Sequence, residues 1–201
     1  HVISDATGWW NIHEVDTAAG RSQPIVEADL EFGVPSWVFG QKTYVWDGQK
    51  VWCTWMDGGV GHVGQIVDGG LRELDSGFTE FNGLGVLAED RVVTIAASWE
   101  KSTAIYALAS DGSSEQLSDP DSLPITSEDV SVPQPIVVSD PHGQPTHAFH
   151  FPPTNSSCFS SSGLPPLLVL SHGGPTGAAR SSFDAGIQYW TERGVAVVDV
   201  N

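Results

Sequence analysis

Cysteine is scarce in this 201-residue chain, which contains only Cys53 and Cys158. Cys53 lies in a strand-like run and Cys158 in a serine-rich loop, so the sequence offers neither a disulfide framework nor a thiolate metal site. We therefore expect no metal and no cofactor. Such sparse cysteine use is typical of a reducing compartment, and it predicts a cytoplasmic protein.

Positive charge is also scarce, with 8 Lys and Arg against 25 Asp and Glu and a formal net charge of -17. A surface of this sign repels nucleic-acid phosphates and anionic lipid headgroups, so we expect neither nucleic acid nor membrane as a partner. The sequence has no uninterrupted apolar run of the length that crosses a bilayer. Its 40% hydrophobic and 16% charged residues predict a globular chain with a core.

From His1 to about Leu117 the sequence consists of short β-type runs separated by turn signals. The turns share an Asp followed by Gly, residues that tolerate Asx-type turns or a positive φ. They are Asp16–Gly20, Asp47–Gly48, Asp57–Gly59, Asp68–Gly70 and Asp111–Gly112. This pattern predicts hairpins in series.

Three segments of this region resemble one another, each pairing an apolar run with an Asp-containing turn and a short polar strand. They begin at Trp10, His62 and Ala104, about 40 to 50 residues apart, which is the period of four-stranded propeller blades. We expect at least two blades and a partial first one. An open all-β sandwich remains the alternative.

Seven of the eight tryptophans precede residue 100. Large aromatic side chains dominate the cores of all-β domains, so core packing is the simpler explanation for Trp37, Trp46, Trp52 and Trp55. A carbohydrate platform or cation cage is the alternative, with Trp9 or Trp10 facing a ligand.

Residues Ser118 to Pro135 are rich in Pro, Ser and acidic residues and predict a linker. We therefore expect propeller blades in residues 1–125 and a second domain in residues 126–201. The second domain opens with a β-hairpin formed by Ile136–Val138 and Thr146–Phe151. Its His147 and His150 are three apart on a strand, face opposite sides and are expected to be ordinary strand residues rather than shared metal ligands.

The last 35 residues predict a strand, a turn, a helix and a second strand. Leu167–Leu170 is apolar throughout, as in a central strand covered on both faces. Ser181 and Asp184 fit a helix capping box, and Gly194 fits a helix stop. Apolar residues at helical spacing, Phe183, Ile187 and Trp190, predict the buried face of that helix, and Val195–Val200 reads as a second buried strand.

The turn after the first of these strands is His172-Gly-Gly-Pro175. Acyl transfer passes through a tetrahedral oxyanion, and losing one preorganised N–H donor to it costs about 2.7 to 4 kcal/mol. Glycines let backbone N–H groups point into a cleft without interference from side chains. We expect Gly174 to be that donor, and His172, Gly173 and Pro175 to shape the turn, with His172 fixing it by side-chain hydrogen bonds.

The run Pro165-Pro-Leu-Leu-Val-Leu-Ser-His-Gly-Gly-Pro-Thr176, followed by Ile187 to Asn201, resembles the start of the hydrolase domain in the prolyl oligopeptidase family of serine peptidases. The similarity is strongest to the acylaminoacyl-peptidase and dipeptidyl-aminopeptidase-like branch. Ser131–Ile136 and His147–Pro153 resemble that family's join between domains. The resemblance implies a multidomain protein in which all-β propeller blades precede the first part of an α/β-hydrolase domain.

The resemblance also places Asn201 beside the cleft and implies a Ser, Asp and His triad in that chain order. No Gly-x-Ser-x-Gly occurs in the chain, so the nucleophile, acid and base would all follow Asn201. The expected function is therefore part of a serine peptidase that hydrolyses short peptides or aminoacyl amides and is inactive without the missing triad.

Two other functions stay open, a propeller scaffold with a vestigial hydrolase segment and a small-molecule esterase or amidase. The expected partners are a short peptide or aminoacyl substrate and the remaining hydrolase segment, and a homo-oligomer also stays open.

Overall fold

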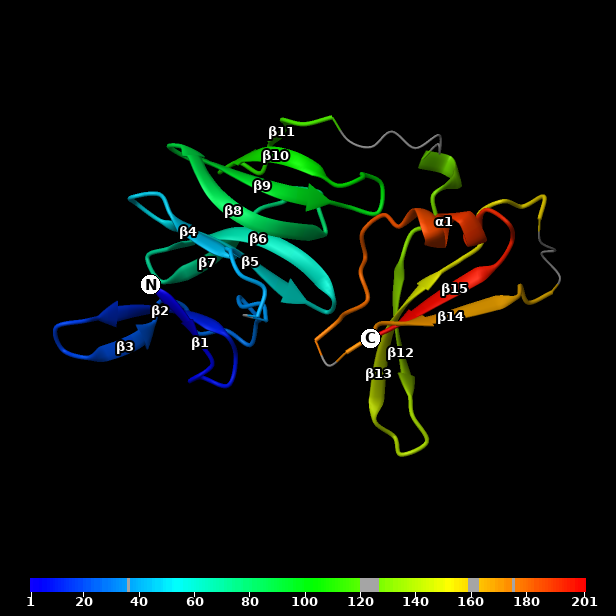
Figure 1. Ribbon diagram of the computed structural model, residues 1–201, viewed down its shortest axis with the longest axis horizontal. Helices are drawn as coiled ribbons and strands as arrows, with labels where there is room; N and C mark the ends of the chain where they lie inside the picture. The colour runs from blue at the N-terminus through cyan, green and yellow to red at the C-terminus, as the bar shows by residue number, and fades with distance from the viewer. Residues whose placement is uncertain (36, 120–126, 159–162, 175) are drawn as a thin grey trace. The chain divides into compact units, whose positions relative to one another are not determined.

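The computed structural model describes residues 1–35, 37–119, 127–158, 163–174 and 176–201. The chain forms two compact units, the first from His1–Ala96 and Ala104–Asp119 and the second from Ala97–Thr103 and Pro120–Asn201 (Figure 1). The domain boundary expected at residue 125 lies outside the described residues and stays a prediction.

The described residues of the first unit form three antiparallel sheets, in each of which consecutive strands pair as a meander (Figure 1). One sheet has three strands and two have four, which is consistent with a partial propeller blade and two full ones. The strands are β1 (Val2–Ser4), β2 (Asn11–Asp16) and β3 (Arg21–Pro24); β4 (Tyr44–Trp46), β5 (Val51–Asp57), β6 (Val60–Val67) and β7 (Gly70–Glu73); and β8 (Glu80–Ala88), β9 (Arg91–Ala97), β10 (Ala104–Ala109) and β11 (Ser114–Gln116).

The predicted Asp-Gly turns join these strands. Asp68 and Gly69 have φ values of +52° and +77° and connect β6 to β7, whose residues Val67 and Gly70 are directly paired. Both central residues of a two-residue type I′ turn need positive φ, which Asp and Gly tolerate better than other residues. The local sequence therefore sets the length of this hairpin.

Alternating side chains of β5 serve two different cores. Trp52 packs in a cluster with Val63 and Val92, whereas Cys53 and Trp55 pack in a second cluster with Ile12 and Phe32. Because neighbouring side chains of a strand point to opposite faces, one strand joins the packing on both sides of its sheet.

Only part of the expected tryptophan core is observed. Trp52 and Trp55 are 0% and 5% exposed, as predicted. Trp37 and Trp46 are 63% and 51% exposed, so the prediction for these two residues was wrong. Trp37 lies outside any strand, and Trp46 ends the edge strand β4 with its ring near that of His1.

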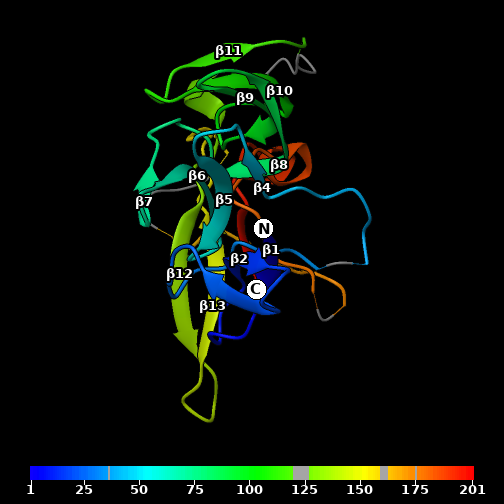
Figure 2. The same cartoon turned by 90° about the vertical axis from the view of Figure 1, so that its left-hand side faces the viewer.

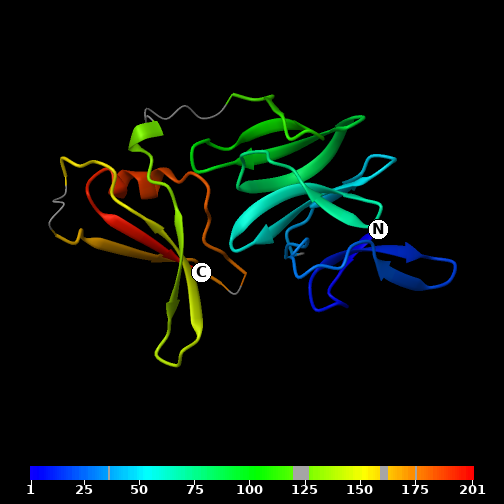
Figure 3. The same ribbon diagram turned by 180° about the vertical axis from the view of Figure 1, so that it is seen from behind.

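The second unit contains one mixed sheet in the order β12-β13-β15-β14, with β14 and β15 parallel and β13 antiparallel to both neighbours. The predicted hairpin is confirmed as β12 and β13, and the helix between β14 and β15 makes a strand–helix–strand unit (Figure 3). No helix among the described residues is long and apolar enough to cross a bilayer. The elements are η1 (Ser127–Asp129), β12 (Gln134–Ser139), β13 (Pro145–Phe151), β14 (Leu167–Ser171), α1 (Ala185–Thr191) and β15 (Ala196–Val200).

Among the described strands β14 lies at the end of the sheet, so the expected central position, covered on both faces, is not seen within these residues. It pairs only with β15 among the described strands, and Leu167 and Val169 are 58% and 59% exposed. An apolar run does not by itself distinguish a strand covered on both faces from one at the end of a sheet.

Helix α1 also begins later than the capping box predicted. Asp184 is its N-cap, with extended backbone and a carboxylate that accepts from the Ile187 N–H. Ser181 and Phe183 precede the helix, and the buried helical residues are Ile187, Gln188 and Thr191, whereas Trp190 is 44% exposed.

The predicted helix stop at Gly194 is confirmed. Its φ is +79°, and its N–H donates to the Thr191 carbonyl.

Candidate active site

The His172-Gly173-Gly174 turn and Asn201 meet at one edge of the second unit's sheet. The parallel strands β14 and β15 are in a register that pairs Ser171 with Val200. Each predicted site residue follows the end of its strand, so the carboxyl ends bring these segments together. Edges of this kind are where open α/β sheets bind ligands.

Gly174 has the backbone conformation that the turn requires. Its φ is +76°, in the left-handed region that favours glycine, and a Cβ added there or at Gly173 would meet nothing within 4 Å. Both glycines are exposed. The arrangement leaves free space around the backbone at Gly174, whereas its role as an oxyanion donor stays a prediction.

His172 is exposed, and its ring packs back against its own turn. A Cβ added at Gly177 would lie 2.6 Å from His172 Nδ1 and 2.8 Å from the Gly173 carbonyl oxygen. Gly177 therefore allows the turn to close on itself, a role that the sequence reasoning missed. The hydrogen-bonding role expected for His172 stays a prediction, and Pro175 lies outside the described residues.

Asn201 connects the end of β15 to the segment after the glycine turn. Its side-chain oxygen Oδ1 accepts from the Ala179 N–H at 3.2 Å, and its own N–H donates to the His147 carbonyl at 2.9 Å. Ala179 is buried. Asn201 thus anchors the segment that leads from the turn to α1.

Asp199 places a partly buried carboxyl next to this edge. Burial raises the pKa of Asp199, the nearby Asp184 carboxylate raises it further, and His172 acts in the opposite direction. In β15 the residue pairs with Leu170 of β14, just before the turn. Three ionisable groups therefore interact through space where the predicted oxyanion turn begins.

A buried glutamine seats the helix behind this edge. Gln188 Oε1 accepts from the Ser131 N–H at 2.7 Å, and Gln188 Nε2 donates to the Ser131 carbonyl at 3.2 Å. The Ser131 hydroxyl donates to the Pro152 carbonyl at 2.6 Å. No sequence signal pointed to this role, because the burial of Gln188 and its partner Ser131 are set only by the fold, in which a buried amide needs partners for both of its groups.

The described residues contain no cluster of His, Cys, Asp or Glu that could hold a metal ion. The groups at this edge include the backbone N–H groups of the glycine turn, the His172 imidazole and the Asn201 amide. Backbone N–H groups are of the kind that binds a developing oxyanion, and that role stays a prediction here.

Solved peptidase structures are similar to this chain over nearly its whole length. Puromycin hydrolase matches 98% of the chain with a TM-score of 0.88 and 28% identity. A puromycin-hydrolyzing peptidase from Mycobacterium tuberculosis matches 99% with a TM-score of 0.89 and 30% identity. A prolyl endopeptidase matches 95% with a TM-score of 0.72 at 18% identity, which is a likeness of fold.

The chain spans only 30% of the length of puromycin hydrolase and 32% of the mycobacterial peptidase. No protein-family model and no curated protein sequence matches it. The likeness to these neighbours therefore concerns the fold of this chain. About two thirds of each of these two neighbours lies outside the matched region.

Proposed function

We propose that this chain, which belongs to the prolyl oligopeptidase family, is the part of a serine peptidase that supplies propeller blades and one half of the oxyanion hole. The observation that carries the proposal is the glycine turn at the carboxyl end of β14, with Gly174 at φ +76°. Two of the solved neighbours are named as puromycin-hydrolyzing enzymes, and this supports our proposal that the substrates are short peptides or aminoacyl amides.

In this mechanism the substrate carbonyl binds beside the carboxyl ends of β14 and β15. The Gly174 N–H donates to the oxyanion as the tetrahedral intermediate forms, and a second donor follows the nucleophile in the missing part of the hydrolase domain. Gly177 and Asn201 hold the turn in place, so the donor needs no reorganisation during the reaction. The isolated chain has no nucleophile elbow and is inactive by itself.

The test is hydrolysis of aminoacyl arylamides and puromycin by a longer protein that continues past Asn201. Two variants at one position test the donor. Gly174→Ala keeps the N–H but strains φ, whereas Gly174→Pro removes the N–H and holds φ at roughly −65°, far from the native +76°. We expect kcat for Gly174→Pro to fall roughly 100-fold below that for Gly174→Ala, with KM little changed.

Equal kcat values for the two variants would rule out Gly174 as the donor. A longer protein that hydrolyses neither substrate would refute the peptidase proposal itself. The isolated chain, assayed in parallel, is expected to be inactive and serves as the negative control.

A further inference from the structure

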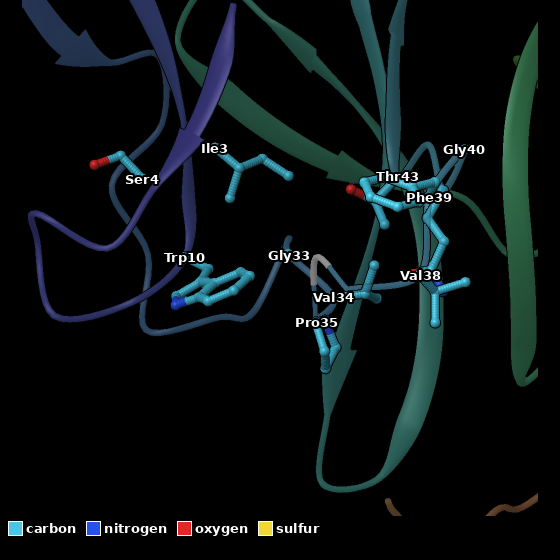
Figure 4. A pocket seen from close by; sticks show the side chains of 11 residues that line it. Ile3, Ser4, Trp10, Gly33, Val34, Pro35, Val38, Phe39, Gly40 and Thr43 are labelled. Carbon is cyan, nitrogen blue, oxygen red and sulfur yellow. The ribbon is translucent and has the colours of Figure 1, made fainter. Parts of the chain in front are cut away.

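The first unit contains a pocket of about 400 Å³ beside the connection between β3 and β4. Trp10 and Ile3 lie on one side, Val38 and Phe39 on the other, and Val34 between them (Figure 4). The volume lies within the range of small-molecule and side-chain sites. All of its lining residues belong to the first unit, and one of them, Ile3, also packs against the cluster that contains Ile12 and Phe32.

Local contacts hold Trp10 in position. Its backbone N–H donates to Glu31 Oε2 at 3.2 Å, and its backbone carbonyl accepts from the Phe32 N–H at 3.0 Å. The indole lies so close to the backbone of Gly33 that an added Cβ would be 2.0 Å from Trp10 Cε3. The ring is therefore fixed by its neighbours, as the wall of a preformed pocket requires.

The opposite rim carries apolar side chains that the protein does not cover. Trp37, Val38 and Phe39 are 63%, 52% and 95% exposed. Figure 2 shows the connection between β3 and β4 standing out from the sheets of its unit. Its end next to β4 is tied down, because the Lys42 carbonyl accepts from the Leu84 N–H and the Thr43 carbonyl from the Thr54 N–H. Exposed apolar side chains that lie together mark surfaces that bind a partner.

The charge of the lining defines the occupant. None of the eleven lining residues is ionisable, although the chain carries 25 acidic residues. The lining residues offer a charged group no direct partner of opposite charge, so the lining favours a neutral apolar group. The aromatic walls suit an aromatic ring, and the Ser4, Gln41 and Thr43 side chains offer neutral hydrogen-bonding groups for a peptide unit.

We propose that this pocket binds an aromatic side chain of a peptide, held between Trp10 and the Val38–Phe39 rim. That the ligand is a peptide rests on the proposed function, whereas its neutral aromatic character rests on the lining alone. The pocket would then make a peptidase containing this chain prefer peptides with an aromatic residue.

Ligand-observed NMR on the 201-residue chain tests binding with N-acetyl-L-phenylalaninamide and, for comparison, N-acetyl-L-lysinamide. A probe of this size is expected to bind with a Kd of roughly 1 mM. We expect the lysine probe to bind at least about 5-fold more weakly because its ammonium group meets no partner of opposite charge among the lining residues. Equal affinities for the two probes, or no binding of the aromatic probe at 10-fold higher concentration, would overturn the proposal.

The matched variants are Phe39→Ser and Leu164→Ser. Both side chains are almost fully exposed, at 95% and 99%, so neither change disturbs a core, and only Phe39 lines the pocket. Phe39→Ser should raise the Kd for the aromatic probe about 5-fold or more, and Leu164→Ser should leave it within 2-fold. Gly33→Ala, which displaces the Trp10 ring, should abolish binding while circular dichroism stays unchanged.

Three results would contradict the site. They are an unchanged Kd for Phe39→Ser, an equal loss for Leu164→Ser, and a wild-type dimer that Phe39→Ser converts to monomer, which would make the rim an interface between copies. Binding of the aromatic probe together with an inactive longer protein would leave the pocket standing and refute only the peptidase proposal.

Discussion

At the scale of single residues, Gly177 is crowded where Gly173 and Gly174 are open. A methyl group there would approach His172 Nδ1 to 2.6 Å and the Gly173 carbonyl oxygen to 2.8 Å, so the turn must open to accommodate it. We predict that Gly177→Ala lowers kcat of a longer, active protein about 10- to 100-fold, because small displacements of a catalytic donor cost that much. Steady-state kinetics check this, with KM expected to change less than 3-fold.

Gly163→Ala is the matched control for this change. Gly163 lies in the segment before β14, and a Cβ added there would meet nothing within 4 Å. Its kinetics should equal those of the wild type. A Gly177→Ala protein with normal kcat would show that the turn tolerates the added methyl group and that its closure does not set the position of the donor.

Which residues could be anticipated from the sequence depends on how local their causes are. Gly194 and the Asp68–Gly69 turn were predictable because each conformation is decided by the residue's own backbone freedom. Gly177 and Gln188 were not, since their roles depend on His172 and Ser131, groups that only the folded chain brings near. The carboxyl-edge position of Gly174 followed from strand order, whereas the anchoring of Ala179 by Asn201 did not.

At the scale of elements, local sequence predicts that a strand forms, whereas its neighbours in the sheet depend on the rest of the fold. The apolar run at residues 167–170 correctly indicated a strand, but its position at the end of the sheet depends on which strands pair, and Leu167 and Val169 are exposed. The α1 cap moved from Ser181 to Asp184 because the Asp184 carboxylate reaches the Ile187 N–H itself. The sequence therefore predicts which segments form strands and helices better than it predicts which residues those segments pack against.

The turn between β4 and β5 depends on one carboxylate. Asp47 accepts from the N–H groups of Gln49 and Lys50 and from the Trp52 indole N–H, each at 2.9 Å. Burial alone would raise the pKa of Asp47, but these donors and the Lys50 charge outweigh it and lower the pKa below the usual 3.8. The ionised side chain thus stabilises the hairpin.

We predict that Asp47→Asn lowers the free energy of unfolding by about 1 to 3 kcal/mol at pH 7. Because the folded-state pKa lies below the unfolded one, the stabilisation is present above about pH 4 and is lost as the pH falls through the folded value. The difference between wild type and variant should therefore shrink towards pH 2. Urea unfolding followed by tryptophan fluorescence at both pH values measures it.

Asp111→Asn is the control for the Asp47 prediction. Asp111 accepts from the Ser113 N–H in an equivalent turn before β11, but it is exposed, so water can replace its contacts. Its replacement should cost clearly less than that of Asp47 at pH 7. A cost of Asp47→Asn that is the same at pH 7 and pH 2 would mean that ionisation of Asp47 does not stabilise the turn.

At the scale of the whole molecule, two opposing properties decide whether the isolated chain stays monomeric. Its net charge of -17 opposes contact between copies, and this repulsion acts over a Debye length of about 10 Å at 0.1 M salt. Among the described strands β14 and β12 end the second unit's sheet, and such ends favour contact because an edge strand offers unpaired N–H and C=O groups to another strand. Salt screens the repulsion and leaves the edges unchanged, so association should increase with ionic strength.

We predict that the 201-residue chain associates through β14 and that Val169→Lys, which places a charge on that edge, makes it monomeric at 0.3 M salt. Val137→Lys is the matched control, because Val137 is 60% exposed on β12 at the opposite end of the same sheet and Val169 is 59% exposed. Sedimentation velocity at about 50 μM should give a mass above 21.4 kDa for wild type and Val137→Lys, and the monomer mass for Val169→Lys. A monomeric wild type would show that the charge outweighs the open edge, and equal effects of both lysines would place the contact away from β14.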